Sequence, residues 1–436
     1  MTQMRVRETE TTDVVVVGGG LAGLVAATVA ARADQQVVLL EPRPLGGRAR
    51  TQVRDGFVFN QGPRALYRNG AGRSVLDELG VPSDRSAQPP SKGSVVLHRG
   101  RLAPLPQGLA SLMRTSLLSP AEKAKLARLM AKLPRLDPDS FASLSFDEAL
   151  ERMDLGPVGG ELFAALVRLT TYSAATDRLD APAALAQVKQ AADGGVLYLD
   201  GGWQPLVDGL AARATEAGAD LRVGEGHGAT EVTERDGSPL VVTAAGERFA
   251  TGSVVVAAGG PDAAAAILGG RPASWPTLGP PALAACLELG LRRRPATRFV
   301  LGVDEPLYLS THAPPADLAP DGAAVVHLMR YLRHDDDRPA TEVRRELWDL
   351  ARVAGIDDAD VVADRFLARM SVTGAIPVAD GGGLPGRVSV EVEDRPGILL
   401  AGDWVGAEGL LADAALASGD RAGSLASCRG ATLEVA

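Results

Sequence analysis

The chain has 436 residues, enough for two or three domains, because a single hydrophobic core stops growing beyond about 250–300 residues. Hydrophobic residues make up 46% and charged residues 23%, as in a globular protein, and the net charge of −9 argues against a nucleic-acid partner. Cys286 and Cys428 are too few for a disulfide scaffold, so we expect two small buried side chains in a reducing, cytoplasmic compartment.

The first 12 residues are charged and lack the apolar core of a secretion signal. We therefore expect residues 1–12 to form a flexible amino terminus. No stretch of the chain approaches about 18 uncharged apolar residues, so we also expect no membrane span.

Residues 13–41 have the order strand, glycine turn, helix, strand, acid. Gly18, Gly20 and Gly23 form a GxGxxG motif, in which the first glycine permits a tight turn, the second lets a pyrophosphate approach the backbone, and the third lets the helix pack on the strand. Glu41 ends the second strand, where it would bind a ribose diol and repel a 2′-phosphate. The segment predicts a dinucleotide site and disfavours NADP.

The segment at residues 44–51 contains Gly46, Gly47 and Arg48. It resembles the GGRxxT motif of the flavoprotein superfamily that contains amine oxidases, protoporphyrinogen oxidases and carotenoid desaturases. This resemblance implies that the segment passes along the pyrophosphate and ribityl chain of FAD, with Arg48 supplying a cation.

The segment at residues 56–64 reads as a short strand that ends in Gly62, Pro63 and Arg64. It is similar to the superfamily segment that passes the isoalloxazine ring, and the GPR form is closest to protoporphyrinogen oxidases. Arg64 is expected near the flavin or substrate; the alternative is an exposed arginine.

The first insert between the flavin segments contains a clear helix at residues 119–133. Ser119, Pro120 and Glu122 form its capping box, and lysines and arginines surround its apolar residues. One interpretation is a peripheral membrane contact through which a lipophilic substrate enters. The alternative, a helix packed on its own domain, is the more usual meaning of such a pattern, because any surface helix is amphipathic.

The resemblance continues through the middle and end of the chain. A GGxxxLxxxL helix begins at Gly201, and a meander ending at residues 253–260 follows; by the resemblance, Ala229 offers its backbone to the adenine. Near the end, the strand at residues 398–401 leads into Gly402 and Asp403, and the resemblance implies that Asp403 binds a ribityl hydroxyl. The last helix is expected to point its N-terminus at the flavin, where its dipole favours the reduced anion.

These motifs together predict the cofactor-binding residues. They are Gly18, Gly20, Leu21, Ala22, Gly23, Glu41, Pro42, Arg43, Gly46, Gly47, Arg48, Gly62, Pro63, Arg64, Ala229, Ala258, Gly402, Asp403, Leu411 and Ala412. We expect the FAD to be non-covalent, because residues 402–406 contain no cysteine. No metal site is expected, since the five histidines have no metal-ligand spacing.

Absent residues narrow the chemistry. The superfamily's amine oxidases carry an active-site lysine in the part of the substrate domain before the GD motif, but the last lysine here is Lys189. Their aromatic cage position before the last helix holds Leu410 or Leu411. The leading hypothesis is therefore a desaturase-like or protoporphyrinogen-oxidase-like FAD enzyme that forms C=C bonds in a hydrophobic or polycyclic small molecule. Amine or amino-acid oxidation is the first alternative, and a flavin-dependent isomerase or a non-redox binding relative is the second.

The sequence indicates no catalytic acid or base. This absence is compatible with hydride transfer to a flavin, because that reaction needs alignment of the C–H bond more than acid–base help. The candidates for catalytic residues are Trp404, Arg64 and Tyr331. Further candidates for the substrate pocket are Tyr172, Arg330, Arg369 and His327.

The predicted fold class is α/β: a Rossmann-type FAD-binding domain, with a parallel sheet and a β-meander, and an interleaved α+β substrate domain. The expected FAD-binding segments are residues 13–95, 200–270 and 385–436. The expected substrate-binding segments are residues 96–199 and 271–384. The oligomeric state is not indicated by the sequence.

Overall fold

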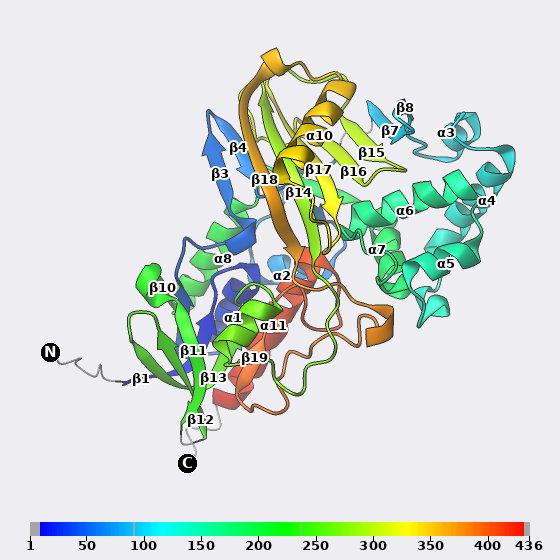
Figure 1. Cartoon of the computed structure of the whole chain (residues 1–436). Helices are drawn as coiled ribbons and strands as arrows, with labels where there is room; N and C mark the ends of the chain where they lie inside the picture. Colours follow the sequence, from blue (N-terminus) through cyan, green and yellow to red (C-terminus); the bar gives the residue numbers. More distant parts are fainter. Residues whose placement is uncertain (1–8, 90–91, 236, 431–436) are drawn as a thin grey trace.

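The computed structural model describes residues 9–89, 92–235 and 237–430. Within these residues the chain builds two seven-stranded sheets, a two-stranded hairpin and a three-stranded sheet. Each large sheet is assembled from segments far apart in the sequence, so the chain passes between the two more than once (Figure 1). The predicted α/β fold class is confirmed.

The first sheet has the strand order β10-β2-β1-β13-β12-β11, with β19 also paired to β13. Its strands are β1 (Thr9–Val17), β2 (Val37–Glu41), β10 (Asp220–Val223), β11 (Ala229–Arg235), β12 (Ser238–Thr243), β13 (Arg248–Val256) and β19 (Ile398–Leu400). β10, β2, β1, β13 and β19 are parallel, while β11 and β12 complete an antiparallel meander. The β-branched runs of β1, β2 and β13 are buried, as central parallel strands require.

Helices α1 (Leu21–Arg32), α8 (Gln204–Glu216) and α11 (Leu411–Gly430) pack together against this sheet. Close packing depends on glycine in α11, since a Cβ at Gly419 would lie 2.4 Å from the carbonyl oxygen of Ala22. The first turn of α1 thereby stays in contact with the terminal helix. Residues from the two ends of the chain are thus brought to the same edge of the sheet.

The second sheet has the order β18-β14-β17-β16-β15-β7-β8. Its strands are β7 (Ser94–His98), β8 (Arg101–Pro104), β14 (Ala282–Leu291), β15 (Phe299–Gly302), β16 (Leu307–Ala313), β17 (Ala324–Leu332) and β18 (Val361–Thr373). One face packs on α10 (Ala340–Val353) through a leucine and valine core. The opposite face carries polar and aromatic side chains, among them Glu288, His327 and Tyr331.

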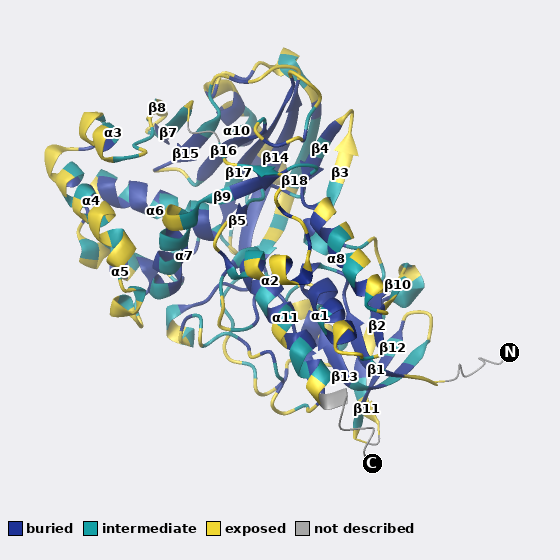
Figure 2. Ribbon diagram, turned by 180° about the vertical axis from the view of Figure 1, so that it is seen from behind, coloured by how far each residue is buried: buried dark blue, intermediate teal, exposed yellow. Residues whose placement is uncertain are grey.

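A helical region flanks the second sheet (Figure 2). It contains α3 (Leu109–Arg114), α4 (Pro120–Lys132), α5 (Phe146–Met153), α6 (Pro157–Thr171) and α7 (Ala181–Gly194). The remaining elements are β3 (Thr51–Arg54), β4 (Phe57–Asn60), β5 (Leu66–Tyr67), β6 (Ser86–Ala87), β9 (Val196–Leu199), α2 (Ala71–Leu79) and α9 (Pro261–Ile267). Short 3₁₀ turns connect several of these. Among the described residues, no helix has both the length and the apolar character needed to cross a membrane.

Two local predictions need correction and one is confirmed. β1 begins at Thr9, so residues 9–12 are a strand and not flexible, because they pair in parallel with β13 from Arg248 onward; residues 1–8 lie outside the described part. Cys286 is buried as expected, but Cys428 is exposed near the end of α11. The Ser119/Glu122 capping box at the start of α4 is confirmed.

Candidate functional site

A cavity of about 500 Å³ lies at the carboxyl ends of the central parallel strands. β1 reaches it at Gly18, β2 at Glu41 and β13 at Ala257. This edge is where ligands bind in open parallel sheets, because the helices that follow the strands present their N-termini there.

The cavity gathers eighteen of the predicted cofactor-binding residues from both ends of the chain. They are Gly18, Gly20, Leu21, Ala22, Glu41, Pro42, Arg43, Gly46, Gly47, Arg48, Pro63, Arg64, Ala229, Ala258, Gly402, Asp403, Leu411 and Ala412. Gly23 and Gly62 are not among its lining residues.

The three glycines of the first motif have separate structural roles. Gly18 has φ +109°, and a Cβ there would lie 2.6 Å from the carbonyl oxygen of Ala257. A Cβ at Gly23 would lie 1.9 Å from the carbonyl oxygen of Gly18, so this position holds helix α1 against β1. A Cβ at Gly20 would meet nothing within 4 Å and would stand in open space in the cavity. Packing therefore does not require a glycine at position 20, and the residue faces open space in the cavity.

The second glycine motif lies against the first. The N–H of Gly46 donates to the carbonyl oxygen of Gly19 at 2.7 Å, and Gly20 and Gly46 form an isolated parallel bridge. Glu41 accepts from the N–H groups of Gly19 at 2.8 Å and Arg43 at 2.9 Å, one on each carboxylate oxygen. The two turns and the acid thus form one backbone cradle.

Arg48 and Asp403 meet across the cavity from segments 355 positions apart in the chain. Arg48 Nη1 lies 2.6 Å from Asp403 Oδ2 and also donates to the carbonyl oxygen of Val372 at 2.8 Å. Burial acts to lower the pKa of the Arg48 guanidinium, but the adjacent Asp403 carboxylate outweighs it and raises the pKa above its ordinary value. The other oxygen of Asp403 accepts from the N–H of Gly374 at 3.1 Å. The Asp403 carboxylate, which lines the cavity, is therefore held by one cation and one backbone donor.

Arg64 lines the cavity near two aromatic side chains, Trp203 and Tyr172, that also line it. Its guanidinium carbon sits 5.5 Å from the ring centre of Trp203, and the nearby Tyr172 hydroxyl donates to the carbonyl oxygen of Pro63 at 3.1 Å. No described acid forms an ion pair with Arg64. Burial, followed by repulsion from Arg48, lowers the pKa of Arg64 to about 10. The result is a cavity-facing cation that lacks a carboxylate of its own.

Helix α11 begins at the cavity with Leu411 and Ala412. The loop before it is clamped by Arg387, which donates to the carbonyl oxygens of Asp403 at 3.2 Å, Glu408 at 3.2 Å and Gly409 at 3.0 Å. Burial lowers the pKa of Arg387 to about 10. Arg387 thus fixes the loop that places the first residues of α11, Leu411 and Ala412, at the cavity.

Two of the predicted catalytic candidates do not lie at the cavity. Trp404 is 1% exposed, and its Nε1 donates to the carbonyl oxygen of Gly259 at 3.2 Å, so its role is to pack the GD strand. Tyr331 is buried with its ring 6.1 Å from that of Tyr172, and it does not line the cavity. Only Arg64 of the three candidates lines it.

Of the remaining candidates for the substrate pocket, Tyr172 lines the cavity and Arg330, Arg369 and His327 do not. Arg330 pairs with Glu346, and Arg369 donates to the carbonyl oxygens of His334 and Asp336. Trp203 lines the cavity but was not predicted; its position directly after Gly201-Gly202 was the available signal.

His327 belongs to a buried cluster on the face of the second sheet opposite α10. Ligand atoms of Cys286, Glu288 and His327 are within 4.8 Å of one another, which no spacing in the sequence indicated. Glu288 is already engaged by the guanidinium of Arg365 and by the N–H of Gly62. We therefore assign this cluster no metal role.

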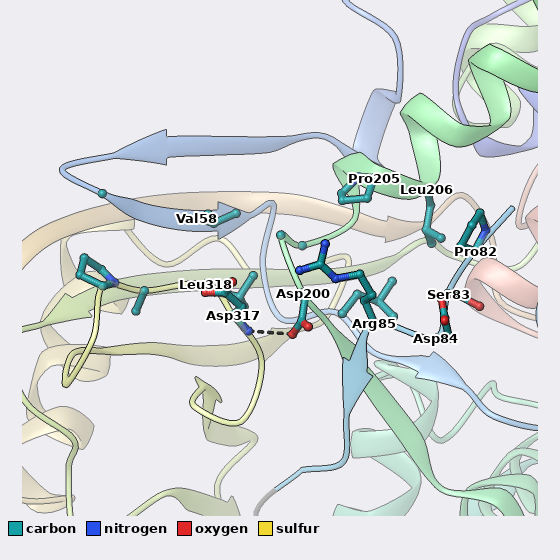
Figure 3. Close-up of a pocket in the computed structure, with 16 residues that line it drawn as sticks. Val58, Pro82, Ser83, Asp84, Arg85, Asp200, Pro205, Leu206, Asp317 and Leu318 are labelled. Carbon is teal, nitrogen blue, oxygen red and sulfur yellow. Dashed lines mark hydrogen bonds between the residues drawn. The ribbon is translucent and has the colours of Figure 1, made fainter.

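A second cavity of about 560 Å³ shares no lining residue with the first (Figure 3). Asp317 donates its N–H to the Asp200 carboxylate at 2.8 Å, and Asp200 donates its N–H to the carbonyl oxygen of Arg85. Gly201, Gly202 and Leu206 of the GGxxxLxxxL motif line this cavity, which the motif did not predict. Its charged residues are Asp84, Arg85, Asp200 and Asp317, an arrangement that identifies no ligand class.

The model of the flavin-containing amine oxidoreductase family matches residues 21–424. The chain belongs to this family. A match to the chloroplastic protoporphyrinogen oxidase of Nicotiana tabacum is 24% identical over 241 residues, which is 54% of this chain and 42% of that protein. The chain therefore matches less than half the length of this relative.

Solved structures confirm the fold. A putative protoporphyrinogen oxidase from Exiguobacterium superposes with a TM-score of 0.69 at 18% identity, covering 97% of this chain and 99% of that one. Putrescine oxidase bound to putrescine superposes with a TM-score of 0.72 at 18% identity, covering 97% of this chain and 100% of that one. At this identity the two structures establish the fold alone.

The family implies a flavin, and the cavity residues fit one. Gly20 and Gly47 leave open backbone where a diphosphate would lie, and α1 and α11 both direct N-termini to the cavity. Trp203 Nε1 and Arg64 Nε are buried at the cavity without a partner among the described residues. Each is a donor that a bound cofactor or substrate could satisfy.

Proposed function

We propose that the protein is an FAD-dependent oxidoreductase that removes a hydride from carbon in a hydrophobic or polycyclic small molecule and leaves a C=C bond. The FAD is proposed to be non-covalent and to occupy the 500 Å³ cavity. The first sheet and its helices would form the FAD-binding domain, and the second sheet with α3 to α7 the substrate domain.

The observation that carries this proposal is the chemistry of the cavity wall. Of the described lining residues, the ionisable ones besides Tyr172 are arginines and two acids, Glu41 and Asp403; none is a lysine or histidine. Glu41 lies at the glycine cradle and Asp403 is paired with Arg48, so neither is free to act as a general base. Hydride removal from carbon depends on alignment and desolvation, which such a wall provides.

Each group in the cavity wall would have a separate role in binding FAD. The backbone at Gly20 and Gly47 would bind the diphosphate, Glu41 the ribose diol and Asp403 a ribityl hydroxyl, while the N-terminus of α11 would stabilise negative charge on the reduced ring. FAD, when bound, would accept the hydride together with its two electrons, and the proton lost from the neighbouring carbon would pass to solvent water. Arg64, Tyr172 and Trp203 would orient the substrate and exclude water.

The test is anaerobic reduction of the yellow protein by a panel of porphyrinogens, isoprenoids, amines and amino acids. Bleaching by the carbon substrates is expected. Bleaching confined to amines would instead support the amine-oxidase alternative, for which the putrescine oxidase fold is the supporting comparison. Rearrangement of a substrate by protein whose flavin has first been reduced, with no net re-oxidation of that flavin, would support an isomerase. A colourless protein that FAD cannot reconstitute would contradict all three.

We further propose that α3, α4 and the β7–β8 hairpin touch an anionic membrane surface, as a cytoplasmic enzyme with a hydrophobic substrate would need. Residues 92–135 contain one acid, the buried Glu122, and nine basic residues: Lys92, Arg99, Arg101, Arg114, Lys123, Lys125, Arg128, Lys132 and Arg135. Leu109 is 60% exposed, Met113 56% and Met130 44%, so these apolar side chains are not packed on the domain. Exposed residues are frequent along α3 and α4 (Figure 2).

Vesicle sedimentation tests this contact. Binding to vesicles with anionic lipids is expected, together with its loss in high salt and in a Leu109→Ser/Met113→Ser variant. Equal sedimentation with neutral vesicles, or no binding to either kind, would contradict the proposal. A Val53→Ser variant is the matched control, because Val53 is an exposed apolar residue outside this surface.

A further inference from the structure

Glu288 is a fully buried carboxylate in the middle of β14, a strand whose ten residues are all buried. A buried charge persists only where its oxygens are satisfied, because its desolvation is costly. One oxygen accepts from the N–H of Gly62 at 3.1 Å and lies 3.2 Å from Nδ1 of His327. The other is bound by the guanidinium of Arg365, the residue directly across from Glu288 on β18.

Arg365 uses its remaining nitrogens on the β3–β4 hairpin. Nη2, which also contacts the Glu288 carboxylate, donates to the carbonyl oxygen of Asn60, and Nη1 donates to Oε1 of Gln52 at 3.0 Å. Glu288 and Arg365 therefore hold three groups in residues 52–62. Gly62 begins the turn that reaches the cavity, Asn60 ends β4 just before it, and Gln52 lies on the neighbouring strand β3.

This turn carries Pro63 and Arg64, which both line the cavity. Gly62 has φ +82°, and a Cβ there would lie 2.4 Å from Cε of Met370, so the turn fits closely against the second sheet. Arg64 has no ion pair with a described residue; its guanidinium lies over the Trp203 ring, and Nη2 donates to the carbonyl oxygen of Gln61 at 3.4 Å, within the same turn. Movement of Gly62 would move the Arg64 guanidinium.

We propose that the buried Glu288–Arg365 pair is a positioning element: it fixes the Gly62–Arg64 turn from the second sheet and so sets the place of Arg64 in the cavity. This rests on the proposed function, in which FAD occupies the cavity beside that turn. Neither residue touches the cavity, so both act through the turn. Through this turn, the position of β14 and β18 in the second sheet would influence the surroundings of the flavin.

The experiment uses the FAD-loaded full chain with sulfite as the probe, because sulfite adds to oxidised flavin without needing the natural substrate. The main variant is Glu288→Met/Arg365→Met, since apolar replacement of a whole buried pair usually keeps the fold. We expect it to retain FAD and thermal stability but to bind sulfite about tenfold more weakly. Loss of a charge-assisted contact has at least that effect on a binding constant.

Three comparisons make the result specific. Glu288→Gln keeps an oxygen acceptor for Gly62 and should give an intermediate sulfite affinity. Arg64→Ala should match the double variant, and the combined triple variant should be no weaker than Arg64→Ala alone, because the pair acts through Arg64. Arg293→Ala is the matched control: its exposed ion pair with Asp360 adjoins the same strands.

A double variant with wild-type sulfite affinity would overturn the proposal, and so would additive losses in the triple variant. If the double variant does not fold, hydrogen exchange at the amides of Gly62 and Arg64 in Glu288→Gln decides the question: faster exchange confined to this turn supports positioning, and unchanged exchange contradicts it. A wild-type protein that never binds FAD would contradict the proposed function instead, so the two failures are distinguishable.

Discussion

Arg48 Nη1 and Asp403 Oδ2 are 2.6 Å apart, and this ion pair joins the GGR turn near the start of the chain to the GD strand near its end. The Arg48 side chain is 35% exposed and the Asp403 side chain 5%, so the acid is the more deeply buried partner. The pair thus couples the predicted pyrophosphate-binding segment to the predicted ribityl-binding segment.

Asp403→Asn should weaken both cofactor binding and the free protein. The amide still accepts from Gly374 but no longer neutralises Arg48, so we expect the free energy of unfolding to fall by about 1–2 kcal/mol, less than for a fully buried pair because Arg48 is partly exposed. FAD affinity should fall about tenfold. Urea denaturation of the flavin-free protein and FAD titration measure the two effects. Unchanged values in both would contradict the role assigned to the pair.

Substitutions at Gly20 and Gly23 should separate ligand binding from packing. Gly20→Val should leave the flavin-free protein as stable as wild type, because its Cβ meets nothing and its φ of −78° suits any residue, yet it should abolish flavin retention. Gly23→Ala should destabilise the protein by about 3 kcal/mol, since the methyl group would overlap the carbonyl of Gly18. Thermal unfolding and flavin absorbance together measure this contrast. A yellow Gly20→Val protein would contradict the assigned cavity.

The elements whose signals are local could be predicted from the sequence. The glycine turn before α1, the capping box before α4 and the strand before Gly402 all combine backbone constraints within a few residues. Such constraints act within one or two turns of chain, so they can be recognised without tertiary information. The cavity residues were predicted from these elements together with the family resemblance, and parallel strands bring the carboxyl ends of the elements to one edge.

The residues that depend on sheet register could not be predicted. Glu288 faces Arg365 only because β14 pairs with β18 in one register, and nothing in either sequence segment indicates that register. Trp404 was wrongly predicted to be a catalytic candidate because it adjoins a flavin motif. Its side chain is instead packed in the core against Trp275. Side-chain direction in these places is decided by packing between distant segments.

Arg387→Met should loosen the loop that leads into α11. Three carbonyl oxygens lose their donor, so we expect the free energy of unfolding to fall by about 1–3 kcal/mol and the reduced flavin to be less stabilised. A more negative flavin midpoint potential is the diagnostic result, measured by anaerobic dye-linked reduction. Arg421→Ala, on the exposed face of the same helix, serves as the control and should leave the potential unchanged. A normal potential in Arg387→Met would contradict the clamp's influence on the helix N-terminus.

His312 should make the protein sensitive to acid. It is 1% exposed, its ring lies 3.7 Å from that of Tyr198 and 4.4 Å from that of His327, and burial followed by repulsion from His327 lowers its pKa well below 6.5. The folded protein therefore excludes a proton that the unfolded chain binds below pH 6.5. The free energy of unfolding should fall with decreasing pH, by up to about 1.4 kcal/mol per pH unit from this residue.

His312→Phe keeps the aromatic stacking on Tyr198 but has no titrating nitrogen. Urea denaturation at pH 7.5 and 5.5 should therefore show a smaller loss of stability in this variant than in wild type, by about 1 kcal/mol. His334→Phe is the matched control, since His334 is exposed and should leave the loss unchanged. An identical pH dependence in His312→Phe and wild type would mean that His312 takes up its proton in the folded state, against the buried and neutral ring that the packing requires.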